Sequence, residues 1–347
     1  MSAREHGEEL AATPARLIPW VEKYRPRTVD EVSHQEEVIA ALRSSIESGK
    51  LPHLLFYGPP GTGKTSTILA VAKQIFGPVE YRKRVLELNA SDERGISVVR
   101  EKVKGFASTT VGSATLNGKK LPPFKLIILD EADSMSEDAQ SALRRTMELY
   151  TRVTRFCLVC NYVSRIIEPL ASRCAKFRFQ PLSEESFTRK IREVAAAEKL
   201  SIEDDAMNTL VDVSKGDMRK GITLLQSSSE YNQGSITVES IVETAGVPPE
   251  EFMDKIWDTI QSKNFNNLIQ CADELQAEGF ALSALIRRFQ ERLLASGESP
   301  FPDTEKAAIM MKLGEVDKAI EDGANEDLQL RAFLSFCMQQ HSLVQAA

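Results

Sequence analysis

The sequence predicts an α/β domain with a parallel sheet, followed by a small helical domain and an all-helical C-terminal domain. Between residues 38 and 179, short apolar runs bounded by turns alternate with amphipathic helical patterns, which is typical of a parallel sheet flanked by helices. From residue 183 onward only helical periodicity appears, and AGVPPEEF (245–252) interrupts it. We therefore expect a disordered lead-in (1–18), a sheet domain (19–180), a small helical domain (181–246) and a C-terminal helical domain (247–347).

Four apolar runs are expected to form the central strands. Each ends in a glycine or a polar residue on its C-terminal side, where open α/β sheets bind ligands. The runs are HLLFYG (53–58), VLELN (85–89), KLIILDE (125–131) and RFCLVCN (155–161). Pro181 ends the strand pattern, and Ser183 followed by two glutamates predicts the first helix of the next domain.

The composition is ordinary for a soluble globular protein. The 347 residues are 42% hydrophobic and 27% charged, with no apolar run approaching the roughly 20 residues of a membrane span. The N-terminus lacks the apolar stretch of a secretory signal, so we expect a protein of the cytosol or nucleus. Five cysteines, an odd number, indicate reduced thiols. Cys157 and Cys160 form a CxxC, but they lie in an expected buried strand, which favours core side chains over zinc or redox chemistry.

Charge is distributed unevenly along the chain. The formal net charge is −7, which by itself does not suggest a nucleic-acid binder. However, residues 81–104 carry seven Lys or Arg against four Asp or Glu, whereas residues 301–347 carry four against eight. A polyanionic partner would therefore meet the first of these regions.

The segment GPPGTGKT (58–65) fits the phosphate-binding loop G-x-x-x-x-G-K-[ST] at every position. It follows an expected strand and runs directly into a helical pattern, which is the context that the motif requires. Backbone N–H groups of such a loop surround phosphates, the lysine reaches the β and γ oxygens, and the final hydroxyl ligates magnesium. We predict ATP with Mg²⁺ as ligands, held by Gly58, Pro59, Pro60, Gly61, Thr62, Gly63, Lys64, Thr65 and Ser66.

The run KLIILDEAD places two carboxylates at a strand end. Asp130 is suited to hold the magnesium together with Thr65, and Glu131 to orient and deprotonate the attacking water. The alternative is a solvated acidic turn. Asn161 ends the next strand, where it is either a helix cap or a group that holds the water or the γ-phosphate. The pair of carboxylates favours hydrolysis over nucleotide binding alone.

These motifs, in this order, resemble those of an AAA+ ATPase with its RecA-like sheet domain. More narrowly, WVEKYRPRTVDEV, NASDERGI, ALRRTME, EPLASRC and GDMRK resemble the small subunits of replication factor C, the eukaryotic clamp loader. The resemblance extends from about Pro19 to the C-terminal helices. It implies an AAA+ domain, a helical lid and an all-α C-terminal collar, which agrees with the boundaries given above.

The resemblance gives two arginines roles in catalysis. Arg173 of the SRC motif corresponds to an arginine finger, which reaches the nucleotide of the adjacent subunit; by itself it would be read as a surface ion pair. Arg219 of GDMRK corresponds to the lid arginine that touches the γ-phosphate of its own site. The N-terminal segment resembles the part that wraps the adenine, which implies roles near the base for Val21, Tyr24, Arg25, Pro26, Val29, Val32 and His34.

The resemblance also implies contacts with DNA and with the sliding clamp. A helix after NASDERGI would track the DNA backbone without reading sequence, through Arg94, Arg100 and Lys104. A solvated charged face is the alternative. Residues 103–106 fall where the family meets the clamp, and the Gly-, Ser- and Thr-rich segment 107–123 is expected to be a flexible loop.

Together these features predict a catalytically competent ATPase subunit of a pentameric clamp loader in the nucleus. Its implied partners are one large and three further small replication factor C subunits, the sliding clamp PCNA and primer-template DNA. The alternative is a nucleotide-gated scaffold with little turnover of its own. An AAA+ helicase or remodeller is disfavoured because NASDERGI stands where a pore-loop aromatic signature is expected.

Overall fold

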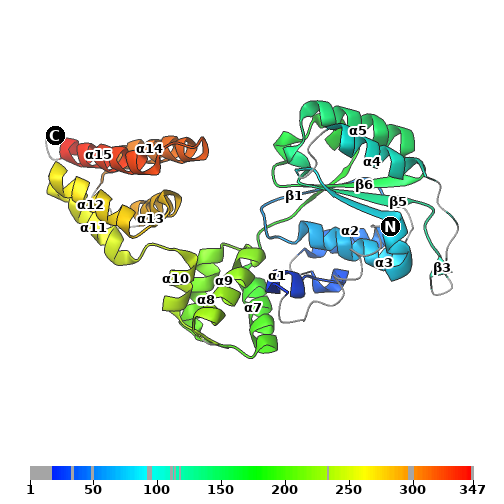
Figure 1. Ribbon diagram of the computed structural model, residues 1–347, viewed down its shortest axis with the longest axis horizontal. Coiled ribbons are helices and arrows are strands. Elements are labelled where there is room, and N and C mark those ends of the chain that lie inside the picture. The colour runs from blue at the N-terminus through cyan, green and yellow to red at the C-terminus, as the bar shows by residue number, and fades with distance from the viewer. Residues whose placement is uncertain are drawn as a thin grey trace, which may run out of the picture. The chain divides into compact units, whose positions relative to one another are not determined.

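The computed structural model describes residues 18–32, 35–47, 51–91, 96–109, 112, 115–116, 119–232, 234–295 and 301–344. The chain divides into two compact units, Met1–Ile236 and Thr237–Ala347. The first contains the sheet and a group of helices, and the second is formed by helices (Figure 1).

A five-stranded parallel sheet forms the centre of the first unit. Its strands lie in the order β2-β5-β6-β1-β7. They are β1 (Leu54–Tyr57), β2 (Val85–Asn89), β5 (Lys125–Asp130), β6 (Thr154–Cys160) and β7 (Ala175–Arg178). The four predicted strands are thus confirmed within a residue or two, and β7 adds a fifth at the edge beside β1. Strand β1 lies between β6 and β7, so the segment that follows it begins at the C-terminal end of an inner strand.

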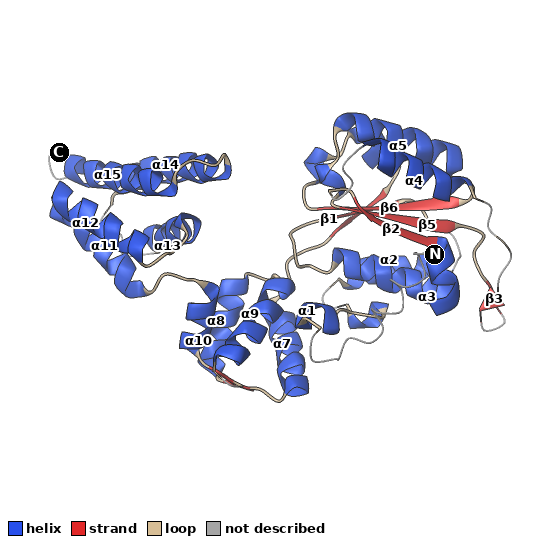
Figure 2. Cartoon of the chain, in the orientation of Figure 1, coloured by secondary structure: helices blue, strands red, loops and turns tan. Residues whose placement is uncertain are grey.

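Helices cover both faces of this sheet (Figure 2). Helices α2 (Glu36–Glu47) and α3 (Lys64–Arg84) pack on one face, and α4 (Ile96–Ser108) and α5 (Glu137–Tyr150) on the other. The strands alternate between the two cores accordingly: Leu126 of β5 packs with α2 and α3, while its neighbour Ile127 packs with α4 and α5. Burial on both faces explains why these strands read as continuous apolar runs.

Two buried cationic side chains hold the C-terminal end of α4 and the segment that follows it, through hydrogen bonds to backbone carbonyls. Lys125, which is 4% exposed, donates from Nζ to the Thr109 carbonyl at 2.5 Å and to the Phe106 carbonyl at the end of α4. Arg84 donates to the carbonyls of Gly112 at 2.7 Å and Pro122 at 2.9 Å. In the segment predicted as a flexible loop, β3 (Thr115–Leu116) and β4 (Lys119–Lys120) form a small antiparallel hairpin.

A group of three helices follows β7 in the first unit, at residues 184–231, and is called the helical group below. Helices α7 (Glu184–Glu198), α8 (Asp204–Ser214) and α9 (Met218–Tyr231) are accompanied by a parallel pair of two-residue strands, β8 (Ser201–Ile202) and β9 (Ser235–Ile236). The predicted helix start is confirmed, because the Ser183 hydroxyl accepts a hydrogen bond from the Ser186 amide. Gly221 lets α9 approach α7 closely, since a Cβ there would lie 2.4 Å from the Phe187 ring.

Short helical segments complete the first unit. They are α1 (Trp20–Lys23), η4 (Val29–Glu31), η5 (Ala132–Ser134), η6 (Val163–Arg165) and α6 (Glu168–Ala171). The helical group fixes α1 at two points: the Trp20 amide donates to Gln226 Oε1 at 3.0 Å, and the Tyr24 hydroxyl to Glu198 Oε1 at 2.5 Å. The N-terminal segment is therefore tied to α7 and α9.

The second unit packs around an aromatic core. Its helices are α10 (Val238–Ala245), α11 (Glu250–Ser262), α12 (Phe265–Ala277), α13 (Leu282–Leu294), α14 (Asp303–Glu321) and α15 (Glu326–Val344). Phe289 stands between Trp257, at 4.8 Å between ring centroids, and Phe333, at 5.1 Å. The expectation of a helical C-terminal region is confirmed.

The cysteines are buried thiols that lie in the two cores beside the sheet and in the core of the second unit. Cys157 and Cys160 are buried in β6, as the strand pattern predicted, and burial raises the pKa of Cys160 to about 12. Within the described residues, no cluster of three or more His, Cys, Asp or Glu has the arrangement of a metal site. The helices of this part of the chain are all too short or too polar to cross a membrane.

Candidate nucleotide-binding site

A pocket lies at the C-terminal edge of the sheet, between the phosphate loop, the strand ends and the helical group of the first unit. It is lined by Val21, Tyr24, Arg25, Pro26, Glu31, Val32, the loop residues 60–66, Asp130, Glu131, Asn161, Leu182, Lys190, Met218, Arg219 and Ile222. Most of the predicted site residues thus meet in one place although they are separated by up to about 200 positions in the sequence.

The phosphate loop follows β1 and turns by means of glycines with positive φ. Gly58 has φ +144°, and a Cβ on it would meet the Phe179 carbonyl oxygen at 2.1 Å, so only glycine fits between β1 and the end of β7. Gly63, with φ +89°, directly precedes α3. The first turn of α3 therefore presents its free N–H groups to the pocket, which is the arrangement that binds phosphate.

Lys64 is held inside the loop. Its Nζ donates to the carbonyls of Gly58 and Pro59, both at 2.8 Å, and to Asn161 Oδ1 at 3.0 Å. Burial lowers the pKa of this ammonium, and the Arg219 guanidinium lowers it further, although Asp130 acts in the opposite direction. Gly58 and Pro59, which were predicted to hold the nucleotide, do not line the pocket. Their carbonyl oxygens instead accept hydrogen bonds from Lys64.

The end of β5 brings two carboxylates to the pocket. The Thr65 hydroxyl donates to Asp130 Oδ2 at 2.8 Å, which places two oxygen ligands of the kind that Mg²⁺ prefers side by side. Glu131 has the left-handed backbone conformation, φ 53° and ψ 39°, and its amide donates to Asp130 Oδ1 at 3.0 Å. A non-glycine residue in this conformation is uncommon, and here it turns the chain out of the strand so that both carboxylates line one pocket.

Asn161 directly follows β6, and a carboxylate of η5 fixes its backbone. Asp133 Oδ2 accepts the amides of Asn161 at 3.0 Å and Tyr162 at 3.1 Å. The Asn161 side chain is thereby aimed at Lys64. The alternatives left open by the sequence were a helix cap and a group in the site, and the geometry brings Asn161 into the pocket lining.

The helical group closes the pocket through helix α9. The Met218 amide donates to the Gly61 carbonyl at 3.3 Å, and Asp217 caps α9 by accepting the Lys220 amide at 3.0 Å. The exposed Arg219 lies one residue further along and lines the same pocket. Helix α9 therefore touches the phosphate loop directly.

The segment predicted to wrap the adenine enters the pocket only in part. Val21, Tyr24, Arg25, Pro26 and Val32 line it, whereas Val29 is 1% exposed and packs in the core beneath. His34 lies outside the described residues.

Five lining residues were not predicted as contacts: Glu31, Leu182, Lys190, Met218 and Ile222. Ile222 could have been found, because it lies one helical turn after Met218 and Arg219. Lys190 of α7 carries no sequence signal that links it to the phosphate loop.

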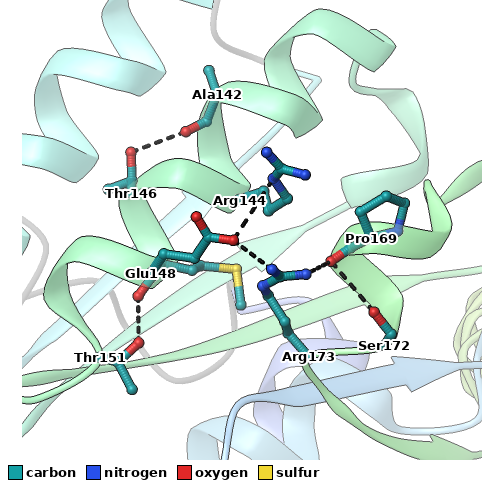
Figure 3. Close-up of polar contacts among 9 residues, drawn as sticks. Ala142, Arg144, Thr146, Glu148, Thr151, Pro169, Ser172 and Arg173 are labelled. Atoms are coloured by element: carbon teal, nitrogen blue, oxygen red, sulfur yellow. Dashed lines mark hydrogen bonds and ion pairs between the residues drawn. The ribbon is translucent and has the colours of Figure 1, made fainter.

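Arg173 is placed elsewhere. Among the described residues it lies outside the pocket lining, after α6, where its guanidinium pairs with Glu148 of α5 (Figure 3). Of the residues predicted to contact DNA, Lys104 is exposed on α4. Arg94 and the side chain of Arg100 lie outside the described residues. Of the expected clamp segment, Val103 is buried in the core, so Lys104, Gly105 and part of Phe106 reach the surface.

Three family models match successive parts of the chain. They describe an ATPase family associated with various cellular activities (AAA) at residues 54–182, an AAA+ ATPase lid domain at 189–229, and the replication factor C C-terminal domain at 248–335. The chain is 53% identical to human replication factor C subunit 4 over 98% of its own length and 93% of that protein. The chain belongs to the replication factor C small subunits. It is therefore an AAA+ ATPase subunit of a clamp loader.

More distant similarities agree with this assignment. Replication factor C subunit 2 of Schizosaccharomyces pombe is 52% identical over 92% of this chain and 94% of that one. The replication factor C small subunit of Archaeoglobus fulgidus is 44% identical over 91% and 96%. A solved RuvB Holliday junction branch migration motor from Thermotoga maritima has a TM-score of 0.52 at 18% identity, covering 93% of this chain and 91% of that one. This last similarity concerns the fold alone.

Proposed function

We propose that this replication factor C subunit binds ATP in the pocket described above and supplies Arg173 to the site of a neighbouring subunit. The observation that carries the proposal is the separation of the catalytic groups. Lys64, Asp130, Glu131 and Arg219 line one pocket, whereas Arg173 lies outside it on an exposed surface. This separation supports a phosphoryl-transfer site that is completed by two subunits.

The residues of the pocket divide the chemistry among themselves. Thr65 and Asp130 would hold the magnesium ion, which neutralises charge on the β and γ oxygens of ATP. The three N–H donors of Lys64 are taken up by Gly58, Pro59 and Asn161, and we propose that ATP replaces one of these acceptors with a phosphate oxygen. Glu131 orients the attacking water and accepts its proton. Arg219 reaches the γ-phosphate from α9, so that the position of this helix responds to the nucleotide.

Arg173 stabilises the charge that develops on the transferring phosphoryl group of the neighbour. Such a guanidinium contributes roughly 10³ to 10⁵ in rate, or about 4 to 7 kcal/mol of barrier. Because it is supplied in trans, hydrolysis depends on assembly of the complex. We propose a pentamer with one large and three further small replication factor C subunits.

The exposed face of α4 and the region after it are the proposed contacts with DNA and with the clamp. Lys104 is exposed on α4, where its ammonium can bind a DNA phosphate. A contact between lysine and a phosphate does not depend on the base sequence. We propose primer-template DNA and the sliding clamp PCNA as partners, and the nucleus as the location. ATP binding would favour clamp opening and DNA binding, and hydrolysis would release both.

Steady-state ATP hydrolysis tests this proposal. The chain alone and the chain assembled with its partner subunits, clamp and primer-template DNA are compared as wild type and as Arg173→Ala. We expect little hydrolysis by the chain alone, a large increase on assembly, and loss of part of this increase in the variant with unchanged ATP affinity. Arg178→Ala, which removes another exposed arginine nearby in the chain, is the matched control. Rapid hydrolysis by the lone chain together with a silent Arg173→Ala would overturn the proposal.

A further inference from the structure

The guanidinium of Arg173 is held by two groups from different elements (Figure 3). Its Nη2 donates to Glu148 Oε1 at 2.5 Å, near the C-terminal end of α5, and its Nη1 donates to the Pro169 carbonyl at 2.5 Å, in α6. Two contacts on the two terminal nitrogens define the plane of the guanidinium as well as its position. The Arg173 side chain is nevertheless 39% exposed.

We propose that Glu148 is a positioning residue for Arg173, which orients the guanidinium for the phosphate of the neighbouring subunit. This inference rests on the proposed role of Arg173 in trans. A guanidinium has five N–H donors, and the contacts with Glu148 and Pro169 need one on each terminal nitrogen. Further donors of the exposed group therefore stay available to a phosphate oxygen.

The physical need for such a residue comes from the flexibility of arginine. A free arginine side chain samples many rotamers, and engaging a phosphate in one geometry costs the entropy of this motion. Glu148 and Pro169 restrict the side chain before the neighbour arrives. The entropy that Arg173 loses when it engages the phosphate is then smaller, which raises the rate of hydrolysis in the neighbouring subunit. The affinity of each pocket for ATP is unaffected, because Glu148 lies outside the pocket lining.

A second arginine lies within ion-pair distance of Glu148. Arg144, one helical turn earlier on α5, places its Nε 3.9 Å from the same Glu148 oxygen. The Glu148 carboxylate is 43% exposed, so its pair with Arg173 is one of the weak surface type. A weak pair suits this role, because it restricts the guanidinium while the donors that it does not use remain available to a phosphate.

The experiment uses the assembled complex with its clamp and primer-template DNA. The finger-dependent rate is defined as the ATPase rate of the wild-type complex minus that of the Arg173→Ala complex. We compare Glu148→Gln, which keeps the shape and an acceptor oxygen, with Glu148→Ala, which removes both. Glu315→Gln is the matched control, since Glu315 forms a similar exposed pair with Lys312 at 2.9 Å in α14. Melting temperatures are measured in parallel to detect damage to α5.

We expect the finger-dependent kcat to fall about two- to five-fold, which is the range that an exposed ion pair supports, with Glu148→Ala the lower of the two. The KM for ATP, the melting temperature and the control variant should stay at their wild-type values. The double variant Glu148→Ala with Arg173→Ala should hydrolyse at the rate of Arg173→Ala alone, because Glu148 acts through Arg173.

Three results would overturn the inference. The Glu148 variants could retain or exceed the wild-type finger-dependent rate, or the double variant could fall below Arg173→Ala, or KM could rise without a change in kcat. If Arg173→Ala itself leaves the complex at its wild-type rate, the proposed function fails and the inference with it. If Arg173→Ala lowers the rate and the Glu148 variants do not, the inference fails alone.

Discussion

Replacing Gly61 by alanine should force the phosphate loop and helix α9 apart. Gly61 has φ +67°, and a Cβ on it would lie 1.7 Å from Oδ1 and 2.2 Å from Cγ of Asp217. Neither side has room to move freely, because Asp217 caps α9 through the Lys220 amide and the Met218 amide donates to the Gly61 carbonyl. The substitution therefore affects backbone conformation and the contact with α9 together.

The cost follows from these two effects. A non-glycine residue in the left-handed region costs about 1 to 2 kcal/mol. Displacing the Asp217 side chain from its capping position costs about 1 kcal/mol more. We expect Gly61→Ala to lower the free energy of unfolding of the nucleotide-free chain by about 2 to 3 kcal/mol. For a unit of this size, the melting temperature should fall by roughly 5 to 10 °C.

Gly63→Ala is the matched control for this measurement. Gly63 also has a positive φ, +89°, but nothing lies within 4 Å of the position of its Cβ. Thermal and urea unfolding of the two variants should show Gly61→Ala to be the less stable by about 1 kcal/mol. Adding Asp217→Ala should remove the clash, so the double variant should lose less than the sum of the two single changes. Equal losses for Gly61→Ala and Gly63→Ala would refute the contact between the loop and α9.

Two further changes test the site and the core. Thr65→Val removes the hydroxyl that donates to Asp130. The ATPase rate of the assembled complex should fall at least about ten-fold, and its dependence on magnesium concentration should weaken. An unchanged magnesium titration would contradict the role of Thr65 as a magnesium ligand. His53 is buried and accepts the Phe156 amide, and burial lowers its pKa to about 4. Because the folded pKa is depressed, the unfolded chain binds more protons below about pH 6.5, and stability should fall by about 2 kcal/mol between about pH 7.5 and about pH 5. His53→Gln should flatten this part of the pH profile of urea unfolding, and an equally steep profile would show that another group titrates.

The local parts of this architecture could be predicted from the sequence because they depend on neighbouring residues. Apolar runs buried on both faces of a sheet gave the central strands, and the glycines with Lys64 and Thr65 gave the phosphate loop. The carboxylates at the end of β5 were equally readable, since a strand followed by Asp130 and Glu131 needs no distant partner to be recognised.

The contacts between distant segments could not be predicted in this way. Asp217 meets Gly61, and Glu148 meets Arg173, through tertiary packing that leaves no local periodicity in the sequence. Lys125 begins a predicted strand, and the sequence gives no sign that its side chain is buried and donates to the carbonyls of Phe106 and Thr109. Buried polar side chains of this kind bond to backbone groups that secondary structure leaves unpaired. Which backbone groups these are depends on how the helices and strands pack, so the local sequence does not reveal them.

A structure of the assembled complex with a non-hydrolysable ATP analogue tests the division of the site between two subunits most directly. In that structure the Arg173 guanidinium should lie within hydrogen-bond distance of the γ-phosphate bound by the neighbouring subunit, about 2.7 to 3.2 Å. Arg219 should contact the γ-phosphate of its own pocket in the same structure. A complex in which Arg173 contacts only Glu148 and Pro169, with no phosphate within hydrogen-bond distance, would contradict the role of Arg173 in the neighbouring site.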